Sequence, residues 1–211
     1  MMMSFPRSPS NAPTDDEIRS SAAMPKNRAI AGVSDHGGWA VLVTVASDGA
    51  ILDRRRVELV DDSLPSIPHH HECQTLPMER AVALVERVRT SAEVYAVRAL
   101  DAVVSAAPQV SGIALRTCPP LPPTIAERIT DHRARNVADW VMYRTALAEA
   151  ARARGWPVYW YDAKTVFASA GEVLHADFDT YFLRMRKRLG PPWNNDHKLA
   201  FAAAIVAASN A

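Results

Sequence analysis

Apolar residues in the first part of the chain form short runs separated by turn residues, as in successive strands. An apolar run over residues 29–34 leads into the turn that contains Asp35, and a continuous β-branched run follows over 39–45. An Asp-Gly turn at Asp48 then leads into an alternating stretch over 51–60, whose polar face is typical of an edge strand. These patterns predict three antiparallel strands at the start of the fold.

Helical periodicity begins after a loop over residues 61–77. Apolar residues over 78–107 form the broad stripe of a long helix, which Pro108 ends. A capping box of Thr124 and Glu127 opens a helical region that we expect to continue to about Arg154. The other predicted elements are strands at 110–116 and 158–161, a short helix from 162 to 167, and helices at 178–189 and 196–208.

The predicted elements follow one another as β-β-β-α-β-α-β-α. Helical crossovers place the fourth and fifth strands parallel to the first. We therefore predict an α/β fold with a mixed five-stranded sheet, in which three antiparallel strands precede two parallel crossovers and helices flank the sheet. Few common α/β folds begin with such a three-stranded meander.

Composition divides the chain into a tail and one domain. Residues 1–27 are rich in proline and serine and are predicted to form a disordered N-terminal tail, whose several methionines leave the natural start open. Residues 28–211 are long enough for a single domain with a substantial core.

Charge, cysteine content and motifs exclude several classes of protein. With a formal net charge of +1, the chain as a whole has no strong electrostatic attraction to nucleic acid or to an anionic membrane. Any such contact would need a local basic patch. Cys73 and Cys118 are expected to be free thiols, and no apolar run approaches the roughly 18 to 20 residues of a membrane span, so we expect a cytoplasmic protein. The sequence contains no P-loop, dinucleotide-binding or serine-hydrolase motif.

Two passages carry a resemblance to a known family. Residues 32–41, Gly-Val-Ser-Asp-His-Gly-Gly-Trp-Ala-Val, place an aspartate and a glycine-containing turn between two strands. Residues 196–204, Asp-His-Lys-Leu-Ala-Phe-Ala-Ala-Ala, begin a helix with an acidic residue and continue it with small ones. Together with the helix and strand over 133–162, these passages resemble the RuvC-type Holliday-junction resolvases of the ribonuclease-H-like superfamily, whose serial order of elements is the one predicted above.

The resemblance implies phosphodiester hydrolysis by divalent ions held on carboxylates, with nucleic acid as the partner. Mg²⁺ or Mn²⁺ would be the expected cofactor, and a homodimer would follow by analogy alone. Asp35 matches the family's ligand after the first strand and Asp196 the ligand on the last helix. We add His197 as a third catalytic group that assists proton transfer. Glu72 and His71 are added as further metal ligands from the loop with the consecutive histidines 69–71, here called the histidine loop.

The fourth predicted strand departs from the family pattern. It ends in Leu115-Arg116-Thr117-Cys118 and lacks a carboxylate, and Arg116 would repel a metal ion. Two functions therefore stay open. One is a divalent-metal-dependent nuclease or resolvase-like phosphodiesterase, and the other is a catalytically degenerate ribonuclease-H-like domain that acts as a binding or interaction module.

Each candidate residue also has a structural interpretation. Asp35 would suit the turn itself and Asp196 would suit a helix N-cap, while the histidine loop would be solvated. Four arginines are candidates for binding substrate phosphates or carboxylates; they are Arg116, Arg133, Arg135 and Arg144. The alternative for these arginines is a set of salt bridges to Asp131, Asp139 and Glu149.

Overall fold

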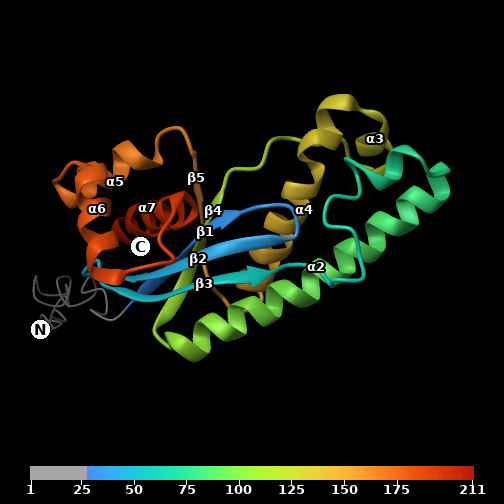
Figure 1. Cartoon of the computed structure of the whole chain (residues 1–211). Helices are drawn as coiled ribbons and strands as arrows, with labels where there is room; N and C mark the ends of the chain where they lie inside the picture. Colours follow the sequence, from blue (N-terminus) through green and yellow to red (C-terminus); the bar gives the residue numbers. More distant parts are fainter. Residues whose placement is uncertain (1–27) are drawn as a thin grey trace, which may run out of the picture.

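A five-stranded mixed sheet forms the centre of the molecule in the computed structural model, which describes residues 28–211. The predicted tail over residues 1–27 lies outside the described residues. The strands are β1 (Ala29–Asp35), β2 (Trp39–Ala46), β3 (Ile51–Glu58), β4 (Val110–Arg116) and β5 (Val158–Tyr161). They lie in the order β3-β2-β1-β4-β5 (Figure 1).

The strand pairing confirms the predicted topology. β1 pairs with β2 and β2 with β3 in antiparallel fashion, whereas β1 pairs with β4 and β4 with β5 in parallel. A three-stranded meander with two parallel strands added beside its first strand is the ribonuclease-H-like fold. Because β1 is the central strand, residues at its carboxyl end lie next to the ends of both β2 and β4.

Helices cover both faces of this sheet (Figure 1). On one side, α2 (Met78–Ala106) crosses α4 (His132–Arg152), with η1 (Glu72–Gln74) and α3 (Ile125–Thr130) at the periphery. On the other side lie α5 (Val166–Leu174), α6 (Phe178–Leu189) and α7 (Asn195–Ser209). None of the helices within residues 28–211 is long and apolar enough to cross a membrane.

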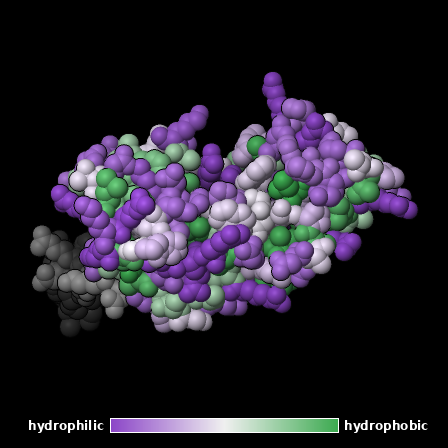
Figure 2. Space-filling view, viewed as in Figure 1, coloured by the Kyte–Doolittle hydropathy of each residue, from purple (hydrophilic) through white to green (hydrophobic). Residues whose placement is uncertain are grey.

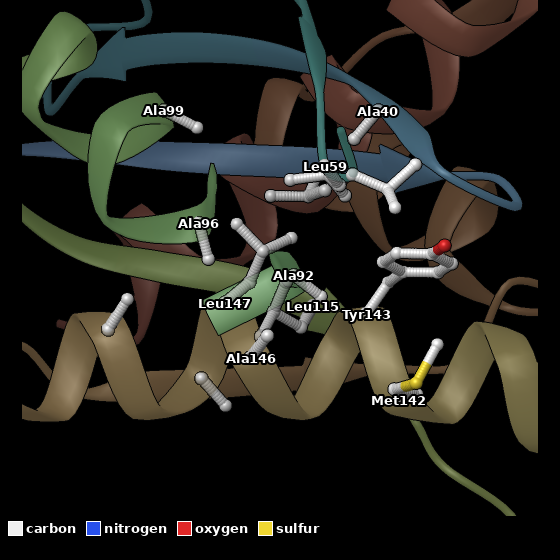
Figure 3. Packing of buried hydrophobic residues seen from close by; sticks show 14 of the residues in the cluster. Ala40, Leu59, Ala92, Ala96, Ala99, Leu115, Met142, Tyr143, Ala146 and Leu147 are labelled. Atoms are coloured by element: carbon white, nitrogen blue, oxygen red, sulfur yellow. The ribbon is translucent and has the colours of Figure 1, made fainter. Parts of the chain in front are cut away.

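The core between the sheet and the α2–α4 layer combines small and large apolar residues (Figure 3). Alanines on α2 and α4 let the two helices approach closely, while leucines fill the space toward the sheet. Tyr143 is buried in this layer and donates a hydrogen bond from its hydroxyl to the Ser66 carbonyl at 2.7 Å. The labelled residues of the cluster are Ala40, Leu59, Ala92, Ala96, Ala99, Leu115, Met142, Tyr143, Ala146 and Leu147.

The opposite face is notable for the close approach of α7 to β1. A Cβ atom on Gly32 would lie 1.9 Å from the Ala200 carbonyl oxygen, so only glycine fits at this point of the strand. The alanines of α7 complete the contact, since residues 200, 202, 203 and 204 are all buried alanines. This packing brings the first turn of α7, with Asp196, to the carboxyl end of β1.

Two helices differ from the prediction. The region from Thr124 to Arg154 is interrupted because the Asp131 side chain accepts hydrogen bonds from the Arg133 and Ala134 amides and so caps a new helix. The short helix predicted over 162–167 instead occupies Val166–Leu174 as α5. The remaining predicted strands and helices are confirmed to within about two residues of their ends.

Candidate functional site

Asp35, the last residue of β1, forms a buried ion pair with Arg144 of α4. The Arg144 Nε donates to Asp35 Oδ2 at 2.7 Å, and the two side chains are only 7% and 1% exposed, respectively. Arg144 also donates from Nη1 to the Thr117 carbonyl at 3.3 Å, just beyond the end of β4. One guanidinium therefore ties together the carboxyl ends of the two central parallel strands.

The ion pair of Asp35 and Arg144 dominates the electrostatics at the carboxyl ends of β1 and β4. Burial raises the pKa of Asp35 above its ordinary value of 3.8, while the adjacent Arg144 and, more weakly, Arg116 favour the charged form. Desolvation is thus the larger effect, and Arg144 is the main compensating charge. The same environment raises the pKa of Tyr161, chiefly through burial and then through the Asp35 charge.

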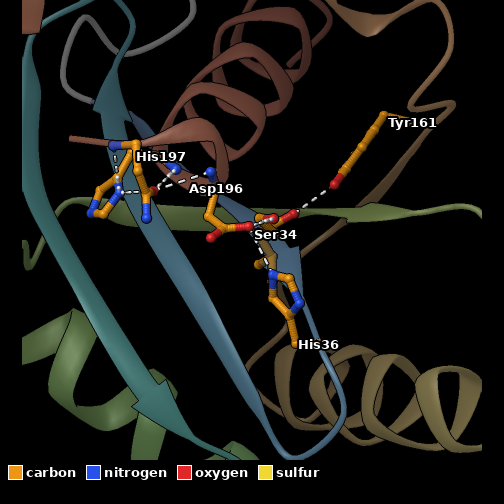
Figure 4. A network of polar contacts seen from close by, with 7 residues as sticks. Ser34, His36, Tyr161, Asp196 and His197 are labelled. Atoms are coloured by element: carbon orange, nitrogen blue, oxygen red, sulfur yellow. Dashed lines mark hydrogen bonds and ion pairs between the residues drawn. The ribbon is translucent and has the colours of Figure 1, made fainter. Parts of the chain in front are cut away.

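Asp196 makes a separate set of contacts at the first turn of α7 (Figure 4). Its Oδ1 accepts a hydrogen bond from Ser34 Oγ at 3.2 Å and lies 2.7 Å from His36 Nε2. The His36 ring in turn stacks on Trp39, with 3.9 Å between ring centroids. Asp196 thus fastens α7 to the β1–β2 hairpin, and its interpretation as the helix N-cap is wrong, because Asn194 is the cap.

His197 belongs to that helix cap. The Asn194 side chain accepts from the Asp196 and His197 amides, and His197 Nδ1 lies 2.7 Å from Asn194 Oδ1. Burial, with Arg54 nearby, lowers the pKa of His197. Figure 4 shows His197 on the other side of Asp196 from His36. The structure therefore gives His197 a role in the cap, and its predicted part in proton transfer stays a prediction.

The four predicted metal ligands do not form one group, although Asp35 and Asp196 both lie at the carboxyl end of β1. Within residues 28–211 no group of three or more His, Cys, Asp or Glu side chains is arranged to hold a metal ion. Asp35 is paired with Arg144 and Asp196 with His36, while His71 and Glu72 are exposed at the start of η1. The histidine loop instead directs its first member inward, where His69 pairs with Asp139. The residues present therefore do not fit the divalent-ion centre that the resemblance implies.

Two of the four candidate arginines, Arg116 and Arg144, meet at one pocket. This pocket of about 330 Å³ lies between the end of β4 and α4. Arg116 is exposed and Arg144 is buried. The other lining residues are Thr117, Pro119, Asn136, Val137 and Trp140. Figure 2 shows the surface hollowed between the lobe of α5, α6 and α7 and the lobe of α2, α3 and α4.

Arg133 and Arg135 lie elsewhere on α4. Arg133 is exposed in the first turn, and Arg135 contacts the Gln74 side chain of η1. Neither lines the pocket: Arg135 lies on the opposite side of the helix from Arg144, whereas Arg133 shares the face of Arg144 but lies about three turns before it.

The salt-bridge alternative named the wrong partners. Asp131 caps α4, Asp139 binds His69, and Glu149 pairs with Arg152. Arg144 is paired with Asp35 instead.

Sequence reasoning did not single out Asn136, Trp140 or His36. Asn136, Trp140 and Arg144 are spaced four residues apart, which places them on one face of a helix. That spacing was visible in the sequence and would have identified the pocket wall. His36 carried only its position beside Asp35 as a signal.

No family model and no curated protein matches this chain. Two solved structures of RuvC from Thermus thermophilus are similar to it in backbone course. The structure of RuvC in complex with a Holliday junction substrate has 16% sequence identity to this chain and a TM-score of 0.48. The match covers 85% of this chain and 91% of the RuvC chain. A second RuvC structure has 17% identity and a TM-score of 0.43, with coverage of 84% and 92%. The assignment of the fold follows from the strand order and pairing described above.

Proposed function

We propose that this ribonuclease-H-like domain binds single-stranded nucleic acid at the pocket beside Arg116 and Arg144, without metal-dependent cleavage. The buried ion pair of Asp35 and Arg144 carries the proposal. It places an arginine where the resemblance implies a divalent ion. The carboxyl ends of β1 and β4 therefore suit an anion better than a cation. The catalytically degenerate alternative is thus the one that the geometry favours.

The donor set supports binding over hydrolysis. Hydrolysis by two metal ions needs several carboxylates free to coordinate them. Here the one carboxylate at the end of β1 already has a guanidinium as its counter-charge, and the end of β4 supplies Arg116 instead of a ligand. A divalent ion beside Asp35 would have to displace Arg144 from a buried site and would face two positive charges.

The pocket also has the groups that an exposed nucleotide requires. Arginine presents a planar fork of donors to phosphate oxygens, and Arg116 is exposed for such a contact. Trp140 offers a partly exposed aromatic face on which a base can stack, and Asn136 offers an amide for the base edge. An unpaired base can enter a pocket of about 330 Å³, whereas a base inside a duplex cannot.

Fluorescence anisotropy with a labelled 20-nucleotide single strand, a duplex and a four-way junction tests the binding. We expect the single strand to bind best. Arg116→Gln should weaken it several-fold, and the slope of log affinity against log salt should fall by about 0.7, as for one lost phosphate contact. The matched control is Arg80→Gln, which removes an exposed arginine on α2 outside this pocket. Equal losses in the two variants, or no binding at low salt, would refute the proposal.

Incubation of the same substrates with Mg²⁺ or Mn²⁺ tests the absence of cleavage. We expect intact substrates and no calorimetric signal for Mn²⁺ binding to the wild-type protein. Cleavage that disappears in Asp35→Asn would instead establish the metal-dependent nuclease and overturn our assignment.

A further inference from the structure

The carboxyl-terminal half of α6 carries a cluster of positive charges that the structure leaves unpaired. Four basic residues in this half are exposed, and their side chains have no ion-pair or hydrogen-bond partner within residues 28–211; they are Arg184, Arg186, Lys187 and Arg188. The nearby acidic residues are occupied, because Asp177 caps the amino end of α6 and Asp179 pairs with Lys198. Figure 1 shows α6 at the outer side of the layer that α5, α6 and α7 form.

Three of these residues share one side of the helix. Arg184, Lys187 and Arg188 are spaced i, i+3 and i+4, so they lie next to one another, away from the buried side of α6. We call these three residues the cationic face of α6. Like charges at such spacings repel each other and destabilise a helix. The fold supplies no carboxylate to offset this repulsion, whereas an anionic partner outside the chain would do so.

Basic residues near the end of a helix often bind its free carbonyl groups, but in α6 a residue from the sheet has that role. Arg54 of β3 donates hydrogen bonds to the carbonyls of Leu189, Gly190 and Pro192, each at 2.9 Å. These bonds fasten the carboxyl end of α6 to the edge strand. Capping therefore does not account for the cationic face, which is held in a fixed position against the sheet.

The same anchor places the cationic face within reach of the pocket beside Arg116. Arg56 follows Arg54 on the same side of β3 and lies over the ring of Trp39, which in turn stacks on His36 in the β1–β2 turn. Three strand spacings of about 4.8 Å separate β3 from β4, so Arg54 and Arg116 lie roughly 15 Å apart in the direction across the sheet. A strand of 20 nucleotides extends over about 68 Å even at the stacked spacing of 3.4 Å, and so can reach both places.

The surroundings of α6 favour the phosphates of nucleic acid over a membrane surface. A helix that lies on a membrane inserts a continuous apolar face. In α6 that face is buried, with Phe178 against Phe201 and Phe182 against Trp193. Leu183, 54% exposed, is the one large apolar residue that α6 leaves exposed. Phosphate contacts require only cations and other hydrogen-bond donors from the protein, which the cationic face supplies.

We propose that Arg184, Lys187 and Arg188 form a second contact site for single-stranded nucleic acid and bind the phosphates of a strand that also occupies the pocket beside Arg116. The inference rests on the proposed function in taking a single strand as the partner. Phosphate contacts carry no sequence information. The cationic face therefore adds affinity and orients the strand, while contacts to bases remain with the pocket.

Anisotropy titrations of the full-length chain with the labelled 20-nucleotide strand, over a series of salt concentrations, test this second site. The triple variant Arg184→Gln/Lys187→Gln/Arg188→Gln should bind roughly a hundredfold more weakly at low salt. Its slope of log affinity against log salt should fall by about 2, because each phosphate contact on a single strand contributes about 0.7. The matched control, Arg80→Gln/Arg87→Gln/Arg98→Gln, removes three exposed charges from α2 and should keep the slope of the wild type. Equal losses in the two folded variants would overturn the proposal.

Arg116→Gln in the same titrations separates the two proposals. If Arg116→Gln weakens binding and the α6 variant binds like its α2 control, the pocket stands and the second site is refuted. If the wild-type protein binds no single strand, both proposals fail.

Two further measurements test the nature of the contact. Arg184→Lys/Arg188→Lys keeps both charges and should bind within about threefold of the wild type. A loss as large as that of the glutamine variant would refute a contact based on charge. Phosphatidylserine vesicles test the other class of partner. If the glutamine variant loses binding to vesicles and retains its binding to the single strand, the cationic face contacts a membrane and the assignment is wrong.

Discussion

Replacing Arg144 with methionine isolates the charge at the end of β1, since methionine retains much of the side-chain length and removes the cation. Asp35, 1% exposed, would then lack its main counter-charge. It must either stay ionised in a buried position or take up a proton. At pH 7, protonation of a carboxyl group whose ordinary pKa is 3.8 costs about 4 kcal/mol. This cost is an upper bound on the electrostatic loss of stability, because Asp35 can take up a proton instead of staying charged. Because burial already raises the pKa of Asp35 in the wild type, we expect a loss of about 3 kcal/mol in the free energy of unfolding.

The pH dependence separates this loss of charge compensation from a loss of packing. In Arg144→Met the pKa of Asp35 should rise further, so the folded state keeps a proton that the unfolded state releases above pH 3.8. Stability then falls as the pH rises from 3.8 to the folded-state pKa, by up to about 1.4 kcal/mol per pH unit. The deficit relative to the wild type should therefore be largest at pH 7 and shrink toward pH 4.

Urea unfolding followed by circular dichroism at pH 5 and pH 7 measures both quantities. The control is the double variant Asp35→Asn/Arg144→Met, in which neither charge remains. We expect it to recover to within about 2 kcal/mol of the wild type and to lose the added pH dependence, because removing a whole buried pair is far less damaging than removing one partner. A deficit of Arg144→Met that is the same at both pH values would refute the reasoning and assign the loss to packing.

Three further predictions concern the framework. Gly32→Ala should lower the free energy of unfolding by about 3 kcal/mol or more in urea titrations, because its Cβ would lie 1.9 Å from the Ala200 carbonyl oxygen; near-wild-type stability would contradict this close approach. Thr124→Ala removes the N-cap of α3 and should destabilise by about 1 kcal/mol in the same titration. Because burial lowers the pKa of His197 below 6.5, the unfolded chain takes up a proton first and stability is lost as the pH falls through 6.5 toward the folded-state pKa. Melting temperatures measured over a series of pH values should therefore fall less steeply below pH 6.5 in His197→Gln than in the wild type. An unchanged fall would exclude this contribution of His197.

The fold was predictable because its signals are local. Short apolar runs with turn residues between them defined the meander, and a single stripe defined the long helix α2. The break before α4 also had a local signal in Asp131, a favoured N-cap residue, but helical periodicity continues across it. Periodicity shows which positions face the core and does not show whether one helix or two present them.

The candidate site was predictable only in part, because its contacts join distant segments. The sequence identifies Asp35 and Asp196 as candidate site residues at the end of β1 and the start of the last helix. The partner of Asp35, however, comes from α4, 109 positions later in the chain. The sequence shows that an arginine and an aspartate exist and contains no local pattern for the crossing of α4 over the end of β1. His69 illustrates the same limit, since three consecutive histidines do not reveal which one turns inward to Asp139.

The charged residues at the carboxyl ends of β1 and β4 form one charge balance. A carboxylate at the end of β1 is buried by the fold itself, and so it needs a positive partner whatever the protein does. The sequence resemblance to RuvC-type resolvases implies divalent ions at this place, and such ions require further carboxylates around them. An arginine at the end of β4 is incompatible with that solution, because it adds a positive charge where a ligand is wanted. Arg144 meets the need with a single fixed charge, so an exposed Arg116 at the end of β4 is compatible with the fold.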